Sequence, residues 1–167
     1  MKGKKKKSIP LAERPYRDCV GLALFNRDGL VFAGRRVDDP AGYWQMPQGG
    51  IDKGEDARTA ALRELREEVG TDKAEVIGEI ERWLSYDLPA EIADKVWGAR
   101  YRGQRQRWFA LRFAGDDGDI DLDAHHPEFA EWRWMKLADL PHSVIGFKRD
   151  IYVQVAATFE KYAQPLR

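Results

Sequence analysis

The sequence has 167 residues, of which 28 are Lys or Arg, 28 are Asp or Glu and one is cysteine. This length suits one domain with a full core and is too short for two. Because the net charge is zero, binding of a polyanion would have to depend on local charge rather than overall charge. The lone Cys19 excludes an internal disulfide and a multi-thiolate metal site, and it suits a reducing, cytoplasmic environment.

The chain begins with the basic run "MKGKKKK" at residues 1–7. A terminal lysine run is usually a solvated tail, and attraction to RNA or another polyanion is the less common alternative. No apolar stretch follows the lysines, so a secretory signal is not expected, and no apolar run is long enough to span a bilayer. We expect residues 1–14 to be a disordered tail and residues 15–167 to form one domain.

A β-hairpin is expected at the start of this domain. Residues 19–25, "CVGLALF", and 30–34, "LVFAG", are apolar and β-prone, and the "NRDG" between them supplies a turn. After a loop, residues 44–55, "WQMPQGGIDKGE", contain short extended pieces among a proline and three glycines. Such glycine density predicts turns with positive φ or a close approach of the backbone to another group.

Residues 56–69 are expected to form a helix. Ala61, Leu65 and Val69 recur one turn apart on the side that would be buried, and Gly70 is a helix stop signal.

Three glutamates, Glu64, Glu67 and Glu68, crowd one side of this helix. They fall within an arc of about 100°, where like charges repel by a few tenths of a kcal/mol per pair. Judged by composition alone, the arginines of the same helix would neutralise these acids. The alternative is a metal ion, and the choice between them decides what the protein does.

Strands and one helix are predicted for the rest of the chain. The β-branched and aromatic content of strands occurs at residues 74–89, 104–113 and 131–136. Residues 147–162 carry apolar side chains at spacings of four, which predicts an amphipathic helix. This order of elements predicts an α+β fold with a mixed sheet between helices.

The glutamates also belong to a longer pattern. Gly49, Glu55 and the octapeptide "RELREEVG" at residues 63–70 stand at fixed spacings that resemble the signature of the Nudix hydrolases at every specified position. Thr71 is the one departure, since the family usually has an aliphatic residue there, and it bears on local packing rather than on activity. The resemblance implies an α/β/α Nudix sandwich with the family's loop–helix motif at residues 49–71.

Carboxylates at positions i, i+3 and i+4 of a helix form an all-oxygen site, which suits Mg²⁺ and also Mn²⁺. Such ions can bridge diphosphate oxygens and lower the pKa of an attacking water. The resemblance implies that Glu64, Glu67 and Glu68 are metal ligands and that one of them polarises the water. Spacing alone does not tell ligand from base.

The same resemblance gives roles to residues beside the glutamates. Arg63 is expected to hold the cluster and its loop in place, and Glu55 could brace the loop by reaching Arg63. A main-chain carbonyl near Gly49 or Gly50 could supply a further metal ligand.

Similarity continues over roughly residues 15–162, through "WQMPQGGID", "GQRQRWF", "PEFAEWRWM" and "FKRD". These stretches resemble the Nudix subgroup that acts on RNA 5′ ends and dinucleoside polyphosphates. The resemblance implies that Glu128 is a catalytic-site glutamate and metal ligand donated by a loop. It further implies substrate contacts, to phosphate or base, from Arg17, Arg36, Gln104, Phe147 and Lys148.

The helix start at Phe147 and Lys148 has two interpretations. Lys148 and Arg149 face the positive end of a helix dipole, a penalty that a bound anion would reverse, while Phe147 could stack on a base. Alternatively, Phe147 packs the helix onto the core and both cations are solvated.

Two further sets of side chains remain open in the sequence. On residues 104–107, either the glutamine pair or the arginine pair could face a polyphosphate. His125 and His126 lie in an Asp-rich loop without metal-ligand spacing, and we expect surface residues rather than proton carriers there.

The sequence thus predicts a Mg²⁺-dependent hydrolase of phosphoanhydride bonds. Its expected substrates are 5′-triphosphorylated RNA, dinucleoside polyphosphates, or both, and neither DNA nor a membrane is an expected partner. A non-catalytic RNA- or nucleotide-binding module should have lost a carboxylate of the cluster, and none is lost. A structural protein with a charged helix would not explain the spacing from Gly49 to Glu55.

Overall fold

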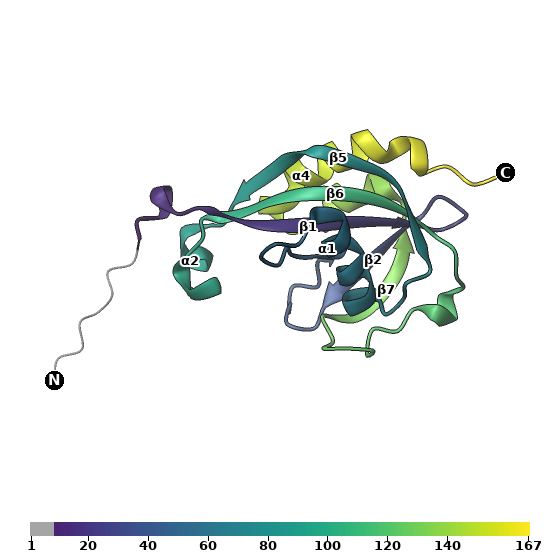
Figure 1. Ribbon diagram of the computed structural model, residues 1–167, viewed down its shortest axis with the longest axis horizontal. Helices are drawn as coiled ribbons and strands as arrows, with labels where there is room; N and C mark the ends of the chain where they lie inside the picture. The colour runs from purple at the N-terminus through teal and green to yellow at the C-terminus, as the bar shows by residue number, and fades with distance from the viewer. Residues whose placement is uncertain (1–8) are drawn as a thin grey trace.

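A seven-stranded mixed sheet forms the centre of the computed structural model, which describes residues 9–167 (Figure 1). Its main path has the order β3-β2-β1-β6-β5, while β4 pairs with β1 and β7 with β2. The β1–β6 pair is parallel and the others are antiparallel. The strands are β1 Tyr16–Phe25, β2 Val31–Arg36, β3 Trp44–Gln45, β4 Gln48–Gly50, β5 Ala74–Asp87, β6 Gly103–Phe113 and β7 Phe129–Met135.

Helices cover both faces of this sheet (Figure 1). The first, α1 (Ala57–Glu64), lies over β1 on one face, and α4 (Arg149–Phe159) lies on the other, preceded by the short α3 (Leu140–Ser143). Apolar side chains fill the space between each helix layer and the sheet. The predicted α+β sandwich is therefore confirmed.

The short α2 (Ala90–Ala93) lies at the end of the sheet from which the N-terminal segment leaves (Figure 1). Single turns of 3₁₀ helix make up most of the other helical structure, at Leu11–Glu13, Trp97–Ala99, Asp117–Asp119, Leu137–Asp139, Gly146–Lys148 and Glu160–Tyr162. The segment from α2 to Trp97–Ala99 connects β5 to β6. It also forms one wall of the cavity described in the next section.

The hairpin predicted between residues 19–25 and 30–34 is present. Asn26 accepts hydrogen bonds at its side-chain oxygen from the backbone N–H groups of Asp28 and Leu30, both at 3.0 Å. Gly29 has a φ of 77°, a conformation that glycine adopts at low cost. The side chain of Asn26 and the freedom of Gly29 thus set the turn.

The helix predicted at residues 56–69 is present at residues 57–69, but not as one regular α-helix. Asp56 caps α1 by accepting a hydrogen bond from the Thr59 N–H at 2.9 Å. After Glu64 the chain widens into a π-helical turn, Leu65–Val69, and Gly70 ends it in the left-handed conformation. The arc of about 100° was predicted for the three glutamates from regular α-helix geometry. That prediction is wrong for Glu67 and Glu68, which lie in the π-helical turn.

The ends of the three strands predicted in the rest of the chain lie within two residues of the ends of β5, β6 and β7. The predicted terminal helix consists of α4 and the 3₁₀ turns on either side of it. Thr71 packs with only 6% exposure, in keeping with its expected structural position. Within residues 9–167, no helix is both long and apolar enough to cross a membrane.

The predicted basic tail falls largely on residues 1–8, which lie outside the described part of the chain. Arg14, also assigned to the tail by sequence, packs as part of the domain. Its guanidinium donates to the carbonyl oxygen of Ala93 at 3.3 Å and pairs with Asp94 at 2.6 Å.

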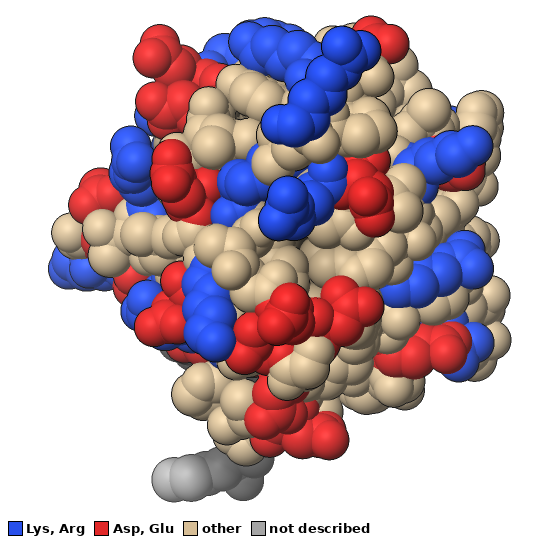
Figure 2. Space-filling view, turned by 90° about the vertical axis from the view of Figure 1, so that its right-hand side faces the viewer, with Lys and Arg blue, Asp and Glu red and all other residues tan. Residues whose placement is uncertain are grey.

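Figure 2 looks onto the end of the sheet opposite the N-terminal segment. It shows acidic and basic side chains interspersed, with acidic ones grouped in the lower half.

Candidate active site

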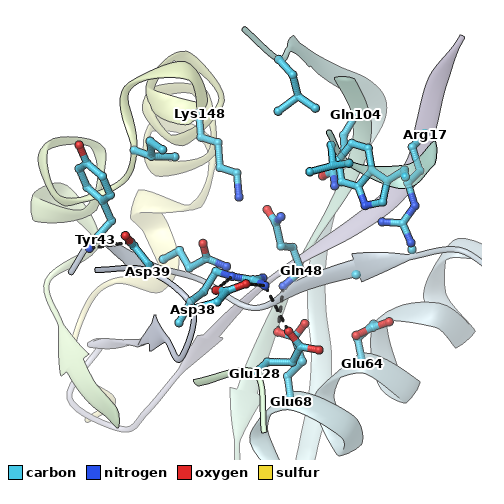
Figure 3. Close-up of a pocket in the computed structure, with 18 of the residues that line it drawn as sticks. Arg17, Asp38, Asp39, Tyr43, Gln48, Glu64, Glu68, Gln104, Glu128 and Lys148 are labelled. Atoms are coloured by element: carbon cyan, nitrogen blue, oxygen red, sulfur yellow. Dashed lines mark hydrogen bonds and ion pairs between the residues drawn. The ribbon is translucent and has the colours of Figure 1, made fainter. Parts of the chain in front are cut away.

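One cavity of about 870 Å³ brings together the site residues predicted from sequence (Figure 3). Glu64, Glu68 and Glu128 lie at its base, Arg17 and Gln104 on one side, and Lys148 on another side. Every predicted metal ligand and substrate contact lines this cavity, whereas Arg63 and Glu55, predicted to brace the loop, do not. Arg63 contacts two of the glutamates that do, Glu64 and Glu67.

The carboxylate of Glu64 lies directly against the backbone of β4. A Cβ placed on Gly49 would come within 2.0 Å of the Glu64 carboxyl carbon, so any other residue at this position would displace the Glu64 carboxylate. Glu64 itself is only 7% exposed. The glycine predicted to allow a close backbone approach therefore makes room for an acidic side chain.

Arg63 joins the helix, the loop and β4. Its guanidinium donates to both carboxylate oxygens of Glu55, at 3.0 and 2.9 Å, and to the Gly50 carbonyl oxygen at 2.8 Å. It also donates to Glu64 at 2.9 Å and to Glu67 at 3.1 Å. The predicted contact between Glu55 and Arg63 is confirmed, and all five N–H donors of the guanidinium are in use.

Glu68 and Glu128 come from different elements, and the charge of Arg36 acts on Glu68 while Arg36 pairs directly with Glu128. Glu68, 7% exposed, accepts a hydrogen bond from the Gln48 backbone N–H at 3.3 Å. Arg36 pairs with Asp38 at 2.8 Å and with Glu128 at 3.5 Å. Asp38 thus neutralises part of the charge of Arg36.

Burial and mutual repulsion disfavour ionisation at the base of the cavity. Desolvation raises the pKa of Glu64 to about 7, with Arg63 opposing the rise and Glu67 and Glu128 adding to it. Desolvation, together with Glu64 and Glu128, also raises the pKa of Glu68 well above its ordinary value. With both carboxyls ionised, the base of the cavity would therefore hold more negative charge than its arginines neutralise.

Two cations in the cavity have no carboxylate partner among the described residues, Arg17 and Lys148. Lys148 is 8% exposed, and desolvation lowers the pKa of its ammonium to about 8, assisted by the charge of Arg36. Because both cations face the cavity unpaired, they are available to an anion. The interpretation in which Lys148 is solvated is wrong.

Phe147 combines the two roles considered for it. Its ring stacks on that of Tyr86, with centroids 5.5 Å apart and 27° between the planes, and it packs against the core under α4. The same side chain lines the cavity. Packing and an exposed ring surface for a ligand are therefore compatible here. Arg149 is exposed, and its Nε donates to the Pro141 carbonyl oxygen at 3.0 Å.

The glutamines of β6 face the cavity side, and the arginines between them face the other side of the sheet. Gln104 is 3% exposed and lines the cavity, and its side-chain oxygen accepts from Gln106 at 2.8 Å. Arg105 and Arg107 instead lie over the Trp83 indole, with guanidinium carbons 4.3 and 4.7 Å from the ring centroid. Of the two pairs that alternate along β6, the glutamines therefore face the cavity side and the arginines do not.

Comparison with known proteins agrees with this geometry. Residues 15–155 match the NUDIX domain. The chain belongs to the Nudix family. It is 53% identical over 154 residues to a protein named RNA pyrophosphohydrolase from Roseobacter denitrificans, covering 91% of this chain and 96% of that one. A second RNA pyrophosphohydrolase, from Rhodospirillum rubrum, is 52% identical over 157 residues, which are 94% of each chain.

A solved structure shows the same fold. The E. coli dihydroneopterin triphosphate pyrophosphohydrolase superposes with a TM-score of 0.63 at 20% identity, covering 87% of this chain and 99% of that chain. The predicted family, hydrolase class and sandwich fold are confirmed together.

Nudix hydrolases depend on a divalent metal ion, and the donors at the base of the cavity fit one. The candidate donors there are carboxylate oxygens, and a cation would stabilise the ionised forms of Glu64 and Glu68 that burial disfavours. No group of three acids or histidines among residues 9–167 is already gathered around one point. Arg63 holds Glu64 and Glu67, and Glu68 is bonded to Gln48.

Several residues that line the Nudix cavity were not singled out from the sequence. Gln48 and Asp38 contact predicted residues directly, but they carry no pattern that distinguishes them from loop residues. His125 and His126 are exposed loop residues, as expected, yet they also line the cavity. The aromatic side chains Tyr86 and Trp97 reach it from β5 and from the connection to β6.

Proposed function

We propose that this Nudix hydrolase removes pyrophosphate from the 5′ end of triphosphorylated RNA. The observation that carries the proposal is the convergence of buried carboxylates and unpaired cations on one cavity. The relatives named RNA pyrophosphohydrolase, about half identical over more than nine tenths of the chain, favour RNA as the substrate. An RNA substrate and the reduced, buried Cys19 both fit a cytoplasmic location.

The metal ion is proposed to be Mg²⁺, with Mn²⁺ as a substitute, because all the candidate donors are oxygens. Its proposed ligands are Glu64, Glu67, Glu68, Glu128 and the main-chain carbonyl of Gly49. When bound, such an ion neutralises phosphate oxygens and lowers the pKa of an attacking water.

The protein's own groups divide the remaining work. The cationic side chains bind the phosphate oxygens and orient the polyphosphate of the substrate for attack at phosphorus. These cations are Arg17, Arg36 and Lys148. A carboxylate of the cluster accepts the proton of the attacking water, and the phosphoanhydride bond breaks as the new phosphorus–oxygen bond forms. Arg63 positions the glutamates and the Gly50 carbonyl without touching substrate. Phe147 and Gln104 contact a base.

Dinucleoside polyphosphates are the second candidate substrates, because they present the same phosphate chain and two nucleobases. The test is to incubate purified protein and Mg²⁺ with 5′-triphosphorylated RNA and, separately, with a dinucleoside tetraphosphate. Release of pyrophosphate from RNA supports the proposal. Cleavage of the dinucleotide alone would transfer the assignment to the second substrate, and hydrolysis of neither would overturn both.

A further inference from the structure

The wall of the cavity between Arg17 and Tyr86 has an ordered layout. In the strand register, Arg17 of β1 lies beside Gln104 of β6, and Gln104 lies beside Tyr86 of β5. All three side chains line the cavity. Because neighbouring strands are about 4.8 Å apart, the backbones of Arg17 and Tyr86 are separated by about 10 Å, with Gln104 midway.

An aromatic ring stands at each end of this row. Phe147 stacks on Tyr86 at one end, with ring centroids 5.5 Å apart. At the other end, the Arg17 guanidinium carbon lies 5.2 Å from the centroid of the Trp97 ring. Both rings line the cavity and both are partly exposed. Two aromatic surfaces therefore face one cavity from opposite ends of the Arg17–Gln104–Tyr86 row.

Trp97 is held in an unusual backbone conformation. Trp97, Gly98 and Ala99 all have positive φ, of 49°, 65° and 57°, although two of the three carry a side chain. Left-handed residues other than glycine are uncommon, and they persist only where the surrounding structure enforces them, often at ligand sites.

The surrounding structure does enforce it. The Arg100 side chain donates to the Trp97 carbonyl oxygen at 3.2 Å, and the edge of the Trp97 ring meets Tyr101, with centroids 6.2 Å apart. Further back, Arg14 holds the segment through Ala93 and Asp94. The Trp97 ring is thus fixed at the cavity rather than free to turn away.

We propose that Trp97 is a stacking platform for a second nucleobase, distinct from the base that contacts Phe147 and Gln104. This inference rests on the proposed function and narrows its substrate class to molecules that carry two nucleobases near the polyphosphate. Such molecules are RNA with at least two nucleotides and dinucleoside polyphosphates. Aromatic stacking accepts any base, so Trp97 adds affinity without selecting among bases.

The test is equilibrium binding in magnesium buffer to three ligands with non-hydrolysable methylene bridges. One is a nucleoside triphosphate with a single base, one a triphosphorylated dinucleotide, and one a dinucleoside tetraphosphate. Trp97→Ala should weaken binding of at least one two-base ligand about 10-fold, as expected for loss of one base stack, and leave the one-base ligand within about twofold. Whichever two-base ligand responds identifies the substrate type.

Two variants control for folding and for charge. Trp97→Phe keeps a ring and should recover most of the lost affinity. Trp83→Ala removes an indole that also lies against arginine guanidinium groups but does not line the cavity, and it should change none of the three affinities.

Equal weakening of all three ligands by Trp97→Ala would overturn the proposal, because it would mean that Trp97 acts only through Arg17 on the phosphates. Unchanged affinities would overturn it as well. Because binding is measured without hydrolysis, the second-base platform can stand or fall independently of the RNA hydrolysis assay.

Discussion

The two ends of the cavity are built in different ways. The carboxylate end comes mostly from one stretch of chain, β4 to the π-helical turn, joined by Glu128 from the loop before β7. The aromatic end is assembled from separate elements, which contribute Arg17, Tyr86, Trp97, Gln104 and Phe147. One end concentrates negative charge, while the other offers ring surfaces, an amide and cations.

This difference indicates a division between chemistry and recognition. Burying negative charge at the carboxylate end costs free energy, and a bound cation beside the reacting phosphate would offset that cost. At the aromatic end, each group adds a small and separable contribution to binding. Substitutions at the carboxylate end should therefore act mainly on kcat, and those at the aromatic end mainly on KM.

The largest effect is expected from Glu68→Gln. Because this change removes one proposed ligand charge while keeping the shape, kcat should fall by at least about 100-fold, corresponding to a few kcal/mol of lost electrostatic stabilisation. Steady-state assays with Mg²⁺ measure it, and Glu79→Gln, on an exposed part of β5, is the control. Near-normal kcat in Glu68→Gln would remove Glu68 from the metal site.

Arg63→Lys should have the next largest effect. Lysine keeps the charge but loses the fork that reaches Glu55, Glu64, Glu67 and Gly50 at once, so activity should fall about 10- to 100-fold. A higher Mg²⁺ concentration should restore part of it, which a purely structural defect would not allow. Arg66→Lys, one turn along at an exposed position, serves as the control.

Lys148→Met tests the recognition end. Methionine fills a similar volume without the ammonium group, so KM for triphosphorylated RNA should rise about 10-fold through the loss of a charge-assisted contact, with kcat little changed. The matched change at exposed Lys136 should alter neither constant. A fall in kcat alone would place Lys148 with the chemical step rather than with binding.

The smallest effect concerns stability and pH. The pKa of Glu64 is raised from 4.5 to about 7, so between these values the metal-free folded state binds more protons than the unfolded state. Its free energy of unfolding should therefore decrease as pH rises through this range, by about 1–3 kcal/mol, or a Tm decrease of several degrees.

Two comparisons sharpen this measurement by thermal denaturation. Glu68→Gln should be more stable than the natural sequence at pH 8 without metal, because it lacks one buried charge. Added Mg²⁺ should raise the Tm of the natural sequence more at pH 8 than at pH 5, since protons compete for the same carboxylates. A flat pH profile without metal would contradict the charge excess described here.

Local patterns in the sequence were sufficient for much of the fold. The hairpin turn at Asn26–Gly29 and the helix stop at Gly70 depend on neighbouring residues and were placed correctly, whereas the cap at Asp56 was not predicted. The fixed spacing from Gly49 to Gly70 likewise predicted the family and the crowded carboxylates. The widening of the helix after Glu64 was missed, because no local residue signals a π-helical turn.

What the sequence determined by itself was most of the carboxylate end, because all its groups except Glu128 lie within one short stretch of chain and their chemistry follows from spacing. The resemblance named Arg17, Gln104 and Phe147 as substrate contacts, but only the tertiary structure decided how the aromatic end is assembled. The face of β6 that carries Gln104, the burial of Lys148 and the placement of Trp97 beside Arg17 all depend on which strands pair and in what register. Such contacts join residues far apart in the chain, and no local pattern encodes them.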